Sequence, residues 1–225
     1  KKLAVSVAAV ATAIGGVTVT TSAAQAATNR DSYADTVENS TFQAARAKYG
    51  LAEQMSEGAT LHAWEWSFKT IEQHIPEIAA AGYTSVQTEP ISAIHTGNKG
   101  KIFTENWYYV YQPTDTTIGN WVMGSESDLK SLCATAHKYG VRIIVDVVAN
   151  HMTATWNAIA DRWKKSDLYH HDCNDGDVQD YNNRYQVTHC KLLSLYDINT
   201  SKTGTASMMH DYLVQAVNDG VDGFR

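Results

Sequence analysis

"VRIIVDVVANH", residues 141–151, has the strongest strand pattern in the sequence. Its first part is a nearly continuous run of β-branched residues, which is typical of a strand covered on both faces in a parallel sheet. Asp146 interrupts this run, and a carboxylate in such a strand needs a partner because an unpaired charge is costly to bury. The stretch ends with Asn150 and His151, whose side chains diverge in an extended backbone. The pattern predicts a buried parallel strand that ends in polar side chains.

The segments on both sides of this strand alternate between strand and helix patterns. Strand patterns occupy residues 59–66, 83–90 and 220–225, and helix patterns occupy residues 70–82, 125–139 and 205–218. This alternation predicts an α/β fold built of βα units, which form the first half of a (β/α)8 TIM barrel. Arg225, on the strand next to residues 141–151, is the expected partner of Asp146. Half a barrel leaves open strand edges, so we expect the sequence to continue beyond Arg225.

A long polar segment interrupts the alternation and predicts a long excursion after the third strand. It covers residues 152–196, and loops of this size in compact domains usually have a function. Cys173 and Cys190 flank its most irregular part, where they are either joined in a disulfide or free thiols. His170 and His171 beside Cys173 resemble a zinc cluster, but they lack the spaced Cys/His pairs of structural sites, so a polar loop is favoured.

The remaining segments complete the expected domain organisation. Residues 59–151 supply barrel strands 1–3, and residues 197–225 supply barrel helix 3 and strand 4. Residues 27–58 are polar and weakly helical, and we interpret them as an N-terminal extension. Cys133 falls on the apolar face of the helix predicted over residues 125–139, where we expect a buried free thiol.

The N-terminus has the pattern of a secretory signal. Two lysines, an uncharged stretch and an Ala-x-Ala site predict cleavage after Ala26, which would change the formal charge from −6 to −8. We therefore expect a secreted, extracellular protein with no membrane contact after the signal is removed. The acidic balance argues against nucleic acid or anionic lipid as a partner, because both require Lys/Arg patches. We expect a monomer that acts on a neutral or cationic substrate.

Aromatic residues cluster in "NWYYVYQP", residues 106–113. Such rings can stack on the apolar faces of sugars, while Tyr and Gln side chains bind sugar hydroxyls. Strand alternation would bury about half of these rings. We assign Trp64 and Trp66 mainly to packing at the first strand.

Six motifs in order resemble the secreted bacterial α-amylases of glycoside hydrolase family 13. They are "LHAWEWSFKTI", "AGYTSVQTEPI", "NWYYVYQPT", "YGVRIIVDVVANH", "LLSLYDINT" and "NDGVDGFR", and the resemblance covers about residues 59–225. It implies a TIM barrel with a calcium-binding domain inserted after the third strand and a further C-terminal β-domain. It also implies retaining hydrolysis of internal α-1,4-glucosidic bonds in starch and malto-oligosaccharides.

The resemblance also implies roles for individual residues. Calcium ligands fall on Asn150, on the carbonyl of Thr188 and on Asp197, which are oxygen donors of the kind calcium prefers. Substrate-binding roles fall on residues that follow the strands or lie in the aromatic segment, namely Tyr108, Tyr111, Gln112, His151 and Arg225.

No catalytic residue is expected within these residues, because the family's nucleophilic Asp stands two places after the arginine that Arg225 matches. The acid/base Glu and a further Asp come from later strands, so we expect the chain by itself to be inactive. Two other interpretations remain open. One is a non-catalytic secreted glucan-binding protein, and the other is a related α-glucosidase or transglycosylase.

Overall fold

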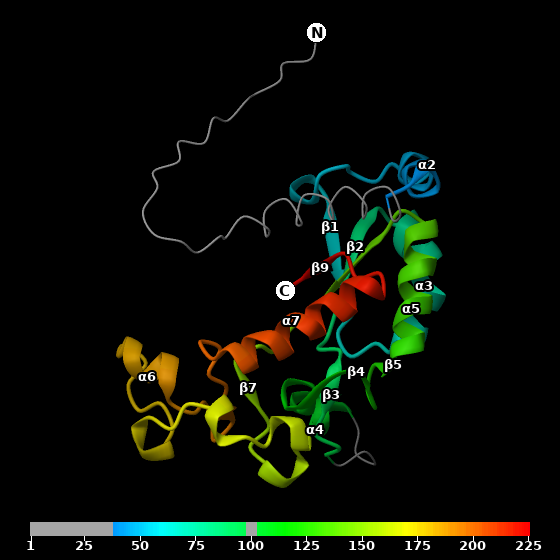
Figure 1. The fold of residues 1–225 in the computed structure, drawn as a ribbon. Helices are drawn as coiled ribbons and strands as arrows, with labels where there is room; N and C mark the ends of the chain where they lie inside the picture. The colour runs from blue at the N-terminus through cyan, green and yellow to red at the C-terminus, as the bar shows by residue number, and fades with distance from the viewer. Residues whose placement is uncertain (1–37, 98–102) are drawn as a thin grey trace, which may run out of the picture. The chain divides into compact units, whose positions relative to one another are not determined.

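A parallel sheet of four strands forms the centre of the molecule (Figure 1). The computed structural model describes residues 38–97 and 103–225, so the predicted signal segment lies outside the described residues. The strands lie in the order β1 (Ala59–His62), β2 (Tyr83–Thr88), β6 (Arg142–Val145) and β9 (Gly223–Phe224), and each pair is parallel. Sheet order follows chain order, which is the arrangement of successive βα units in a barrel. The predicted α/β fold class is confirmed.

Three helices connect these strands and share one core with the sheet. They are α3 (Phe68–Ala80), α5 (Glu126–Lys138) and α7 (Thr203–Asn218), and α3 and α5 lie side by side (Figure 1). The core joins the buried apolar residues of all three helices to Val86, Ile143 and Val145 of the sheet. Ser125 begins α5 with a capping box to Asp128, and both groups satisfy backbone N–H donors that the helix leaves open.

The third strand is shorter than expected and is covered on one face. Ile143 and Val145 are buried against the helices, whereas Ile144, which points to the other face, is only half-buried. Regular pairing ends at Val145, although the amide of Val147 still donates to the carbonyl of Arg225 over 3.0 Å. The expectation of a strand buried on both faces is therefore wrong for the described chain.

A second, antiparallel sheet forms between β2 and α5. It contains β3 (Ser92–Ile94), β4 (Pro113–Asn120) and β5 (Gly124–Ser125). The Asn120 amide donates to the carbonyls of Pro90 and Ser92, both over 3.0 Å, and so fixes the ends of this sheet. Between β3 and β4, the aromatic segment forms α4 (Phe103–Asn106) and the 3₁₀ helix η2 (Trp107–Tyr111). The alternating burial expected for a strand is therefore wrong here.

The segment after the third strand has its own small core and little regular structure. Its elements are β7 (His151–Met152), η3 (Trp156–Ala158), η4 (Asp161–Trp163), η5 (Ser166–Leu168), η6 (Cys173–Asp175), α6 (Arg184–His189) and β8 (Tyr196–Asp197). β7 and β8 pair antiparallel, so the two ends of the segment lie together. Trp163 is fully buried at the centre of the small core. Cys173 and Cys190 are joined in a disulfide.

The described part of the N-terminal extension packs against the amino-terminal side of the sheet. It contains α2 (Ser40–Tyr49) and η1 (Met55–Glu57). The Arg46 guanidinium donates to the carbonyl of Gly140 over 2.8 Å, and Arg142 pairs with Glu38. Gly140 has φ +73°, and a Cβ there would lie 2.6 Å from Arg46 Cγ, so this contact requires glycine.

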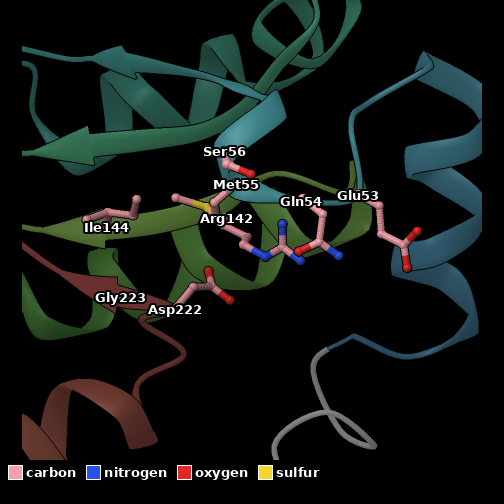
Figure 2. A pocket seen from close by; sticks show the side chains of 8 residues that line it. All are labelled: Glu53, Gln54, Met55, Ser56, Arg142, Ile144, Asp222 and Gly223. Atoms are coloured by element: carbon pink, nitrogen blue, oxygen red, sulfur yellow. The ribbon is translucent and has the colours of Figure 1, made fainter.

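A pocket opens at this amino-terminal side of the strands (Figure 2). It is lined by Glu53, Gln54, Met55, Ser56, Arg142, Ile144, Asp222 and Gly223. Two of its charged groups already have partners, since Arg142 binds Glu38 and Asp222 accepts from the amide of Ile143. Because its lining includes residues at the starts of β6 and β9, the pocket lies at the edge of the sheet opposite the predicted site residues.

Two further expectations concern burial and membranes. Cys133 is a buried free thiol, as predicted, and burial raises its pKa well above the ordinary value. Within residues 38–97 and 103–225, no helix has both the length and the apolar character needed to cross a bilayer.

Asp222 generates a stability prediction because its carboxylate connects α5, β6 and β9. Its Oδ2 accepts from the Ile143 amide over 2.7 Å and lies 2.9 Å from His137 Nε2, and the side chain is 3% exposed. Asp222→Ala leaves a buried N–H unsatisfied and should lower the free energy of unfolding by about 2 kcal/mol. Urea unfolding measures this loss. Asp211→Ala, at an exposed position of α7, is the matched control and should be near neutral; equal effects of both variants would contradict the prediction.

Candidate active site

The four parallel strands end in polar side chains at the same edge of the sheet. His62 is the last residue of β1, and Glu89, Asp146 and Arg225 directly follow β2, β6 and β9. Barrel enzymes place their chemistry at this carboxyl-terminal edge. We call these side chains, together with Tyr111 at the end of η2, the strand-end cluster.

Asp146 lies at the centre of the strand-end cluster. It is 5% exposed, and its Oδ2 accepts from Arg225 Nη1 over 2.6 Å and from the Tyr111 hydroxyl over 3.2 Å. The pair that the sequence predicted is therefore present. The charge of Asp146 raises the pKa of Arg225 above its ordinary value, and burial raises the pKa of Tyr111. Arg225 stays positive and Tyr111 stays a neutral donor, so both stabilise the buried carboxylate.

Sequence reasoning missed Glu89, which is fully buried at the end of β2. Its Oε1 lies 2.7 Å from His62 Nε2. Glu65 lies nearby, and burial together with the charge of Glu89 raises the pKa of Glu65 to about 7. The sequence contains one signal that could have identified Glu89 as a site residue: it is an acidic residue directly before Pro90, at the end of a predicted strand. These acids give the carboxyl-terminal edge more negative charge than Arg225 alone offsets.

His151 faces the aromatic segment from β7. Its Nε2 lies 3.0 Å from the carbonyl of Tyr111, and burial lowers its pKa, which favours the neutral ring. Among the described residues, its buried Nδ1 has no hydrogen-bond partner. Gln112 lies beside it and accepts from the Thr153 hydroxyl over 2.9 Å. The arrangement brings His151, Tyr111 and Gln112 together, with a neutral imidazole ring whose Nδ1 is shielded from solvent.

Exposed aromatic rings border this cluster. Tyr108 is 41% exposed, and its ring lies 4.5 Å from that of Tyr109 and 6.0 Å from that of Trp107. Trp64 is also exposed, with its ring 6.4 Å from Trp107. The assignment of Trp64 and Trp66 to packing is wrong, because β1 ends at His62 and the following turn leaves both indoles exposed. Exposed rings of this kind can stack on sugar faces.

Two of the three residues proposed as calcium ligands lie together. Asn150 Nδ2 lies 3.2 Å from Asp197 Oδ1, and burial raises the pKa of Asp197 to about 6. A buried carboxylate beside an amide fits a hard cation, since the amide can turn its oxygen toward the ion. Thr188 lies on α6, where its hydroxyl donates to the Arg184 carbonyl. The donor set therefore fits calcium through Asn150 and Asp197.

Comparisons with known proteins agree with this geometry. Residues 68–225 match the family model of the α-amylase catalytic domain. The α-amylase of Clostridium acetobutylicum is 39% identical over 181 residues, which cover 78% of this chain and 23% of that enzyme. The α-amylase of Butyrivibrio fibrisolvens is also 39% identical, over 77% of this chain and 18% of that enzyme. The chain thus spans about a quarter or less of the length of these curated relatives.

A solved structure has the same arrangement of elements. It is a single-residue variant of α-amylase I from Eisenia fetida in complex with maltohexaose, with a TM-score of 0.67 and 26% identity over 78% of this chain and 38% of that one. With its parallel strands, their polar carboxyl-terminal ends and these matches, the chain belongs to the α-amylase family.

Proposed function

We propose that the whole protein hydrolyses internal α-1,4-glucosidic bonds of starch and malto-oligosaccharides with retention of configuration. The observation that carries this proposal is the strand-end cluster, in which Tyr111 and Arg225 converge on buried Asp146 beside an exposed aromatic surface. The maltohexaose bound to the Eisenia fetida enzyme supports an α-glucan as the substrate class.

In the proposed mechanism, the residues of this chain position the sugar and control charge. The Tyr108 ring stacks on the sugar at the cleavage point, and neutral His151 binds one of its hydroxyl groups. Arg225, held by Asp146, stabilises an ionised nucleophilic aspartate two places further along the same strand, where side chains share one face. A retaining enzyme needs this nucleophile about 5 Å from a carboxylic acid that protonates the leaving oxygen.

The direct test uses the protein produced from its complete coding sequence. With an end-blocked maltoheptaoside, we expect internal cleavage and an initial product with the α configuration, measured by proton NMR before mutarotation. Pullulan serves as a control, since cleavage restricted to its α-1,6 bonds would identify a different glucosidase. Cyclic products, or binding to insoluble starch without hydrolysis, would contradict the proposal.

Asp146 and Arg225 should affect turnover more than substrate binding. Asp146→Asn weakens the hold on Arg225, and a misplaced catalytic group can cost about 100-fold in rate. We therefore expect kcat to fall by about that factor in Asp146→Asn and by at least as much in Arg225→Gln, with KM nearly unchanged. Arg162→Gln is the matched control, because Arg162 also pairs with a carboxylate, Asp115, away from the strand-end cluster. A loss confined to KM would contradict this role.

We also propose that Asn150, Asp197 and the carbonyl of Thr188 hold a structural calcium ion. When bound, the ion would neutralise the buried carboxylate and join β8 to the end of the third strand. Calcium added to metal-free protein at 100 times its dissociation constant should stabilise it by about 2.7 kcal/mol. Thermal unfolding measures this gain, which Asp197→Asn should lose and Asp161→Asn, at an exposed position, should keep. An unchanged calcium response in Asp197→Asn would refute the assignment.

Export and a monomeric state complete the proposal. The signal-like pattern before residue 27 and the Cys173–Cys190 disulfide support a secreted protein, since disulfides persist outside the cytosol. The formal charge of −6 supports a partner other than nucleic acid.

A further inference from the structure

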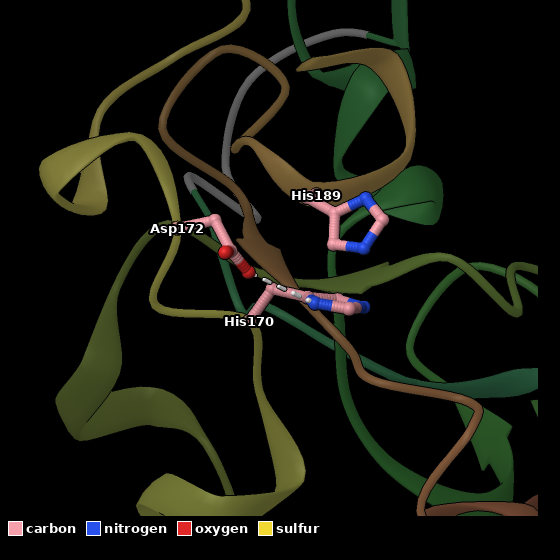
Figure 3. A group of neighbouring side chains, drawn as sticks. All are labelled: His170, Asp172 and His189. Atoms are coloured by element: carbon pink, nitrogen blue, oxygen red, sulfur yellow. Dashed lines mark hydrogen bonds and ion pairs between the residues drawn. The ribbon is translucent and has the colours of Figure 1, made fainter. Parts of the chain in front are cut away.

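A cluster of metal-binding side chains lies in the segment inserted after the third strand. His170, Asp172 and His189 each offer a ligand atom, and these atoms lie within 4.8 Å of one another. Figure 3 shows the two imidazole rings beside each other, with the Asp172 carboxylate next to His170. All three side chains are half-buried, so an ion could enter from solvent and still be partly shielded from it.

Tyr185 contacts two members of this cluster, Asp172 and His189, and leaves each with an atom that can bind a metal ion. Its hydroxyl donates to Asp172 Oδ1 over 2.5 Å, and Asp172 Oδ2 faces His170 Nδ1 at 3.3 Å. Its carbonyl lies 3.2 Å from His189 Nδ1, which is also 2.7 Å from the Thr188 hydroxyl oxygen. Because that hydroxyl donates to the Arg184 carbonyl, His189 carries its proton on Nδ1, and Nε2 keeps its lone pair. Metal-bound histidines in proteins commonly have such an outer partner.

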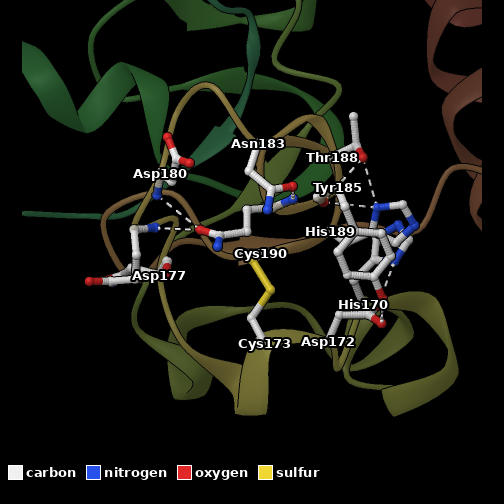
Figure 4. The surroundings of a disulfide bond; sticks show 12 residues. His170, Asp172, Cys173, Asp177, Asp180, Asn183, Tyr185, Thr188, His189 and Cys190 are labelled. Atoms are coloured by element: carbon white, nitrogen blue, oxygen red, sulfur yellow. Dashed lines mark hydrogen bonds and ion pairs between the residues drawn. A yellow bond between two sulfur atoms is a disulfide. The ribbon is translucent and has the colours of Figure 1, made fainter.

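The disulfide fixes the two chain segments that carry the ligands. Cys173 directly follows Asp172, and Cys190 directly follows His189 (Figure 4). The bond therefore brings together groups that are 17 residues apart in the sequence and keeps them together when no ion is bound. A site prepared in this way loses less chain entropy on binding than one formed by a flexible loop.

We propose that His170, Asp172 and His189 bind a zinc ion, with a fourth position left to water. Two imidazole nitrogens and one carboxylate oxygen suit zinc, whereas calcium takes oxygen ligands. In a tetrahedral zinc site with bonds of about 2.0–2.1 Å, neighbouring ligand atoms are about 3.3 Å apart. His170 Nδ1 and Asp172 Oδ2 already have this separation, and since all the ligand atoms lie within 4.8 Å of one another, no gap must close by more than about 1.5 Å.

The proposed zinc ligands share only His170 with the three residues that resemble a zinc cluster in the sequence, and none with the proposed calcium ligands. His171 is exposed and binds Asp175 and the Ser166 carbonyl, and Cys173 is consumed by the disulfide. Two contacts join the proposed zinc ligands to the proposed calcium residues. The His170 amide donates to the Asp197 carbonyl over 3.0 Å, and His189 Nδ1 lies 2.7 Å from the Thr188 hydroxyl oxygen. The zinc ion would thus stabilise the inserted segment next to the calcium site with a separate set of side chains.

The test is a titration of the metal-free protein, made from its complete coding sequence, with Co²⁺ as a spectroscopic substitute for Zn²⁺. We expect one equivalent of Co²⁺ to give the intense visible absorption of a tetrahedral ion, and Zn²⁺ to displace it. Tyr185→Phe removes the outer partner of Asp172 and should weaken Zn²⁺ binding about 10- to 100-fold. His170→Ala and His189→Ala remove ligands and should weaken it further.

Two controls separate this site from its surroundings. His171→Ala, next to the cluster, should leave the Co²⁺ spectrum unchanged. Asp197→Asn should also retain it, although it loses the calcium response, so the two proposals can fail independently. An octahedral spectrum, displacement of Co²⁺ by excess Ca²⁺, or an unaltered titration in His189→Ala would overturn the zinc site. Retention of the calcium response in the histidine variants shows that they are folded.

Discussion

The buried carboxylate of Asp146 is the constraint on which the rest of the site depends. It can stay ionised next to the core only with a cation, and Arg225 supplies that charge from the adjacent strand. The same two strands are joined there by backbone bonds from Arg225 to Val145 and from Val147 to Arg225. The Tyr111 hydroxyl donates to the same carboxylate oxygen, and the Tyr111 carbonyl lies within hydrogen-bond distance of His151 Nε2. One acidic group therefore positions both the aromatic segment and β7. The ion pair thus connects the sheet, the aromatic surface and the inserted segment.

The inserted segment is stabilised by fixed links in place of regular structure. β7 and β8 close its base, Trp163 fills its small core, and the disulfide crosses its polar part. This matters for function because His151 lies in β7, at the point where the segment leaves the barrel strands. Loosening the segment would move His151 relative to Tyr111, so groups far from the sugar affect the geometry of the site. Metal ions bound in this segment would hold it in place and so help to keep His151 next to Tyr111.

Local patterns predicted the elements of the barrel, and non-local contacts account for what they missed. The β-branched run at residues 141–145, the spacing of α3 and the cap of α5 are local signals, so strand order and helix positions followed from the sequence. The sheet of β3 and β4 depends on pairing across the aromatic segment. His189 reaches His170 only because the chain folds back through the disulfide, a contact that spacing cannot show. The burial of Glu89 likewise depends on neighbours distant in sequence, including His62.

Charge at the carboxyl-terminal edge of the sheet must serve two opposing requirements in the proposed reaction. Negative side chains favour an oxocarbenium-like transition state, but they also repel the carboxylate that has to attack the sugar. Arg225 offsets one charge, and because the pKa of Glu65 is raised to about 7, this second acid carries a proton about half of the time near neutral pH. Glu89 lies next to His62, and Asp146 accepts hydrogen bonds from Tyr111 and Arg225. These contacts spread the charge of the two carboxylates over neighbouring groups. The edge therefore keeps an attractive field for a developing positive charge while limiting the repulsion that an ionised nucleophile would meet.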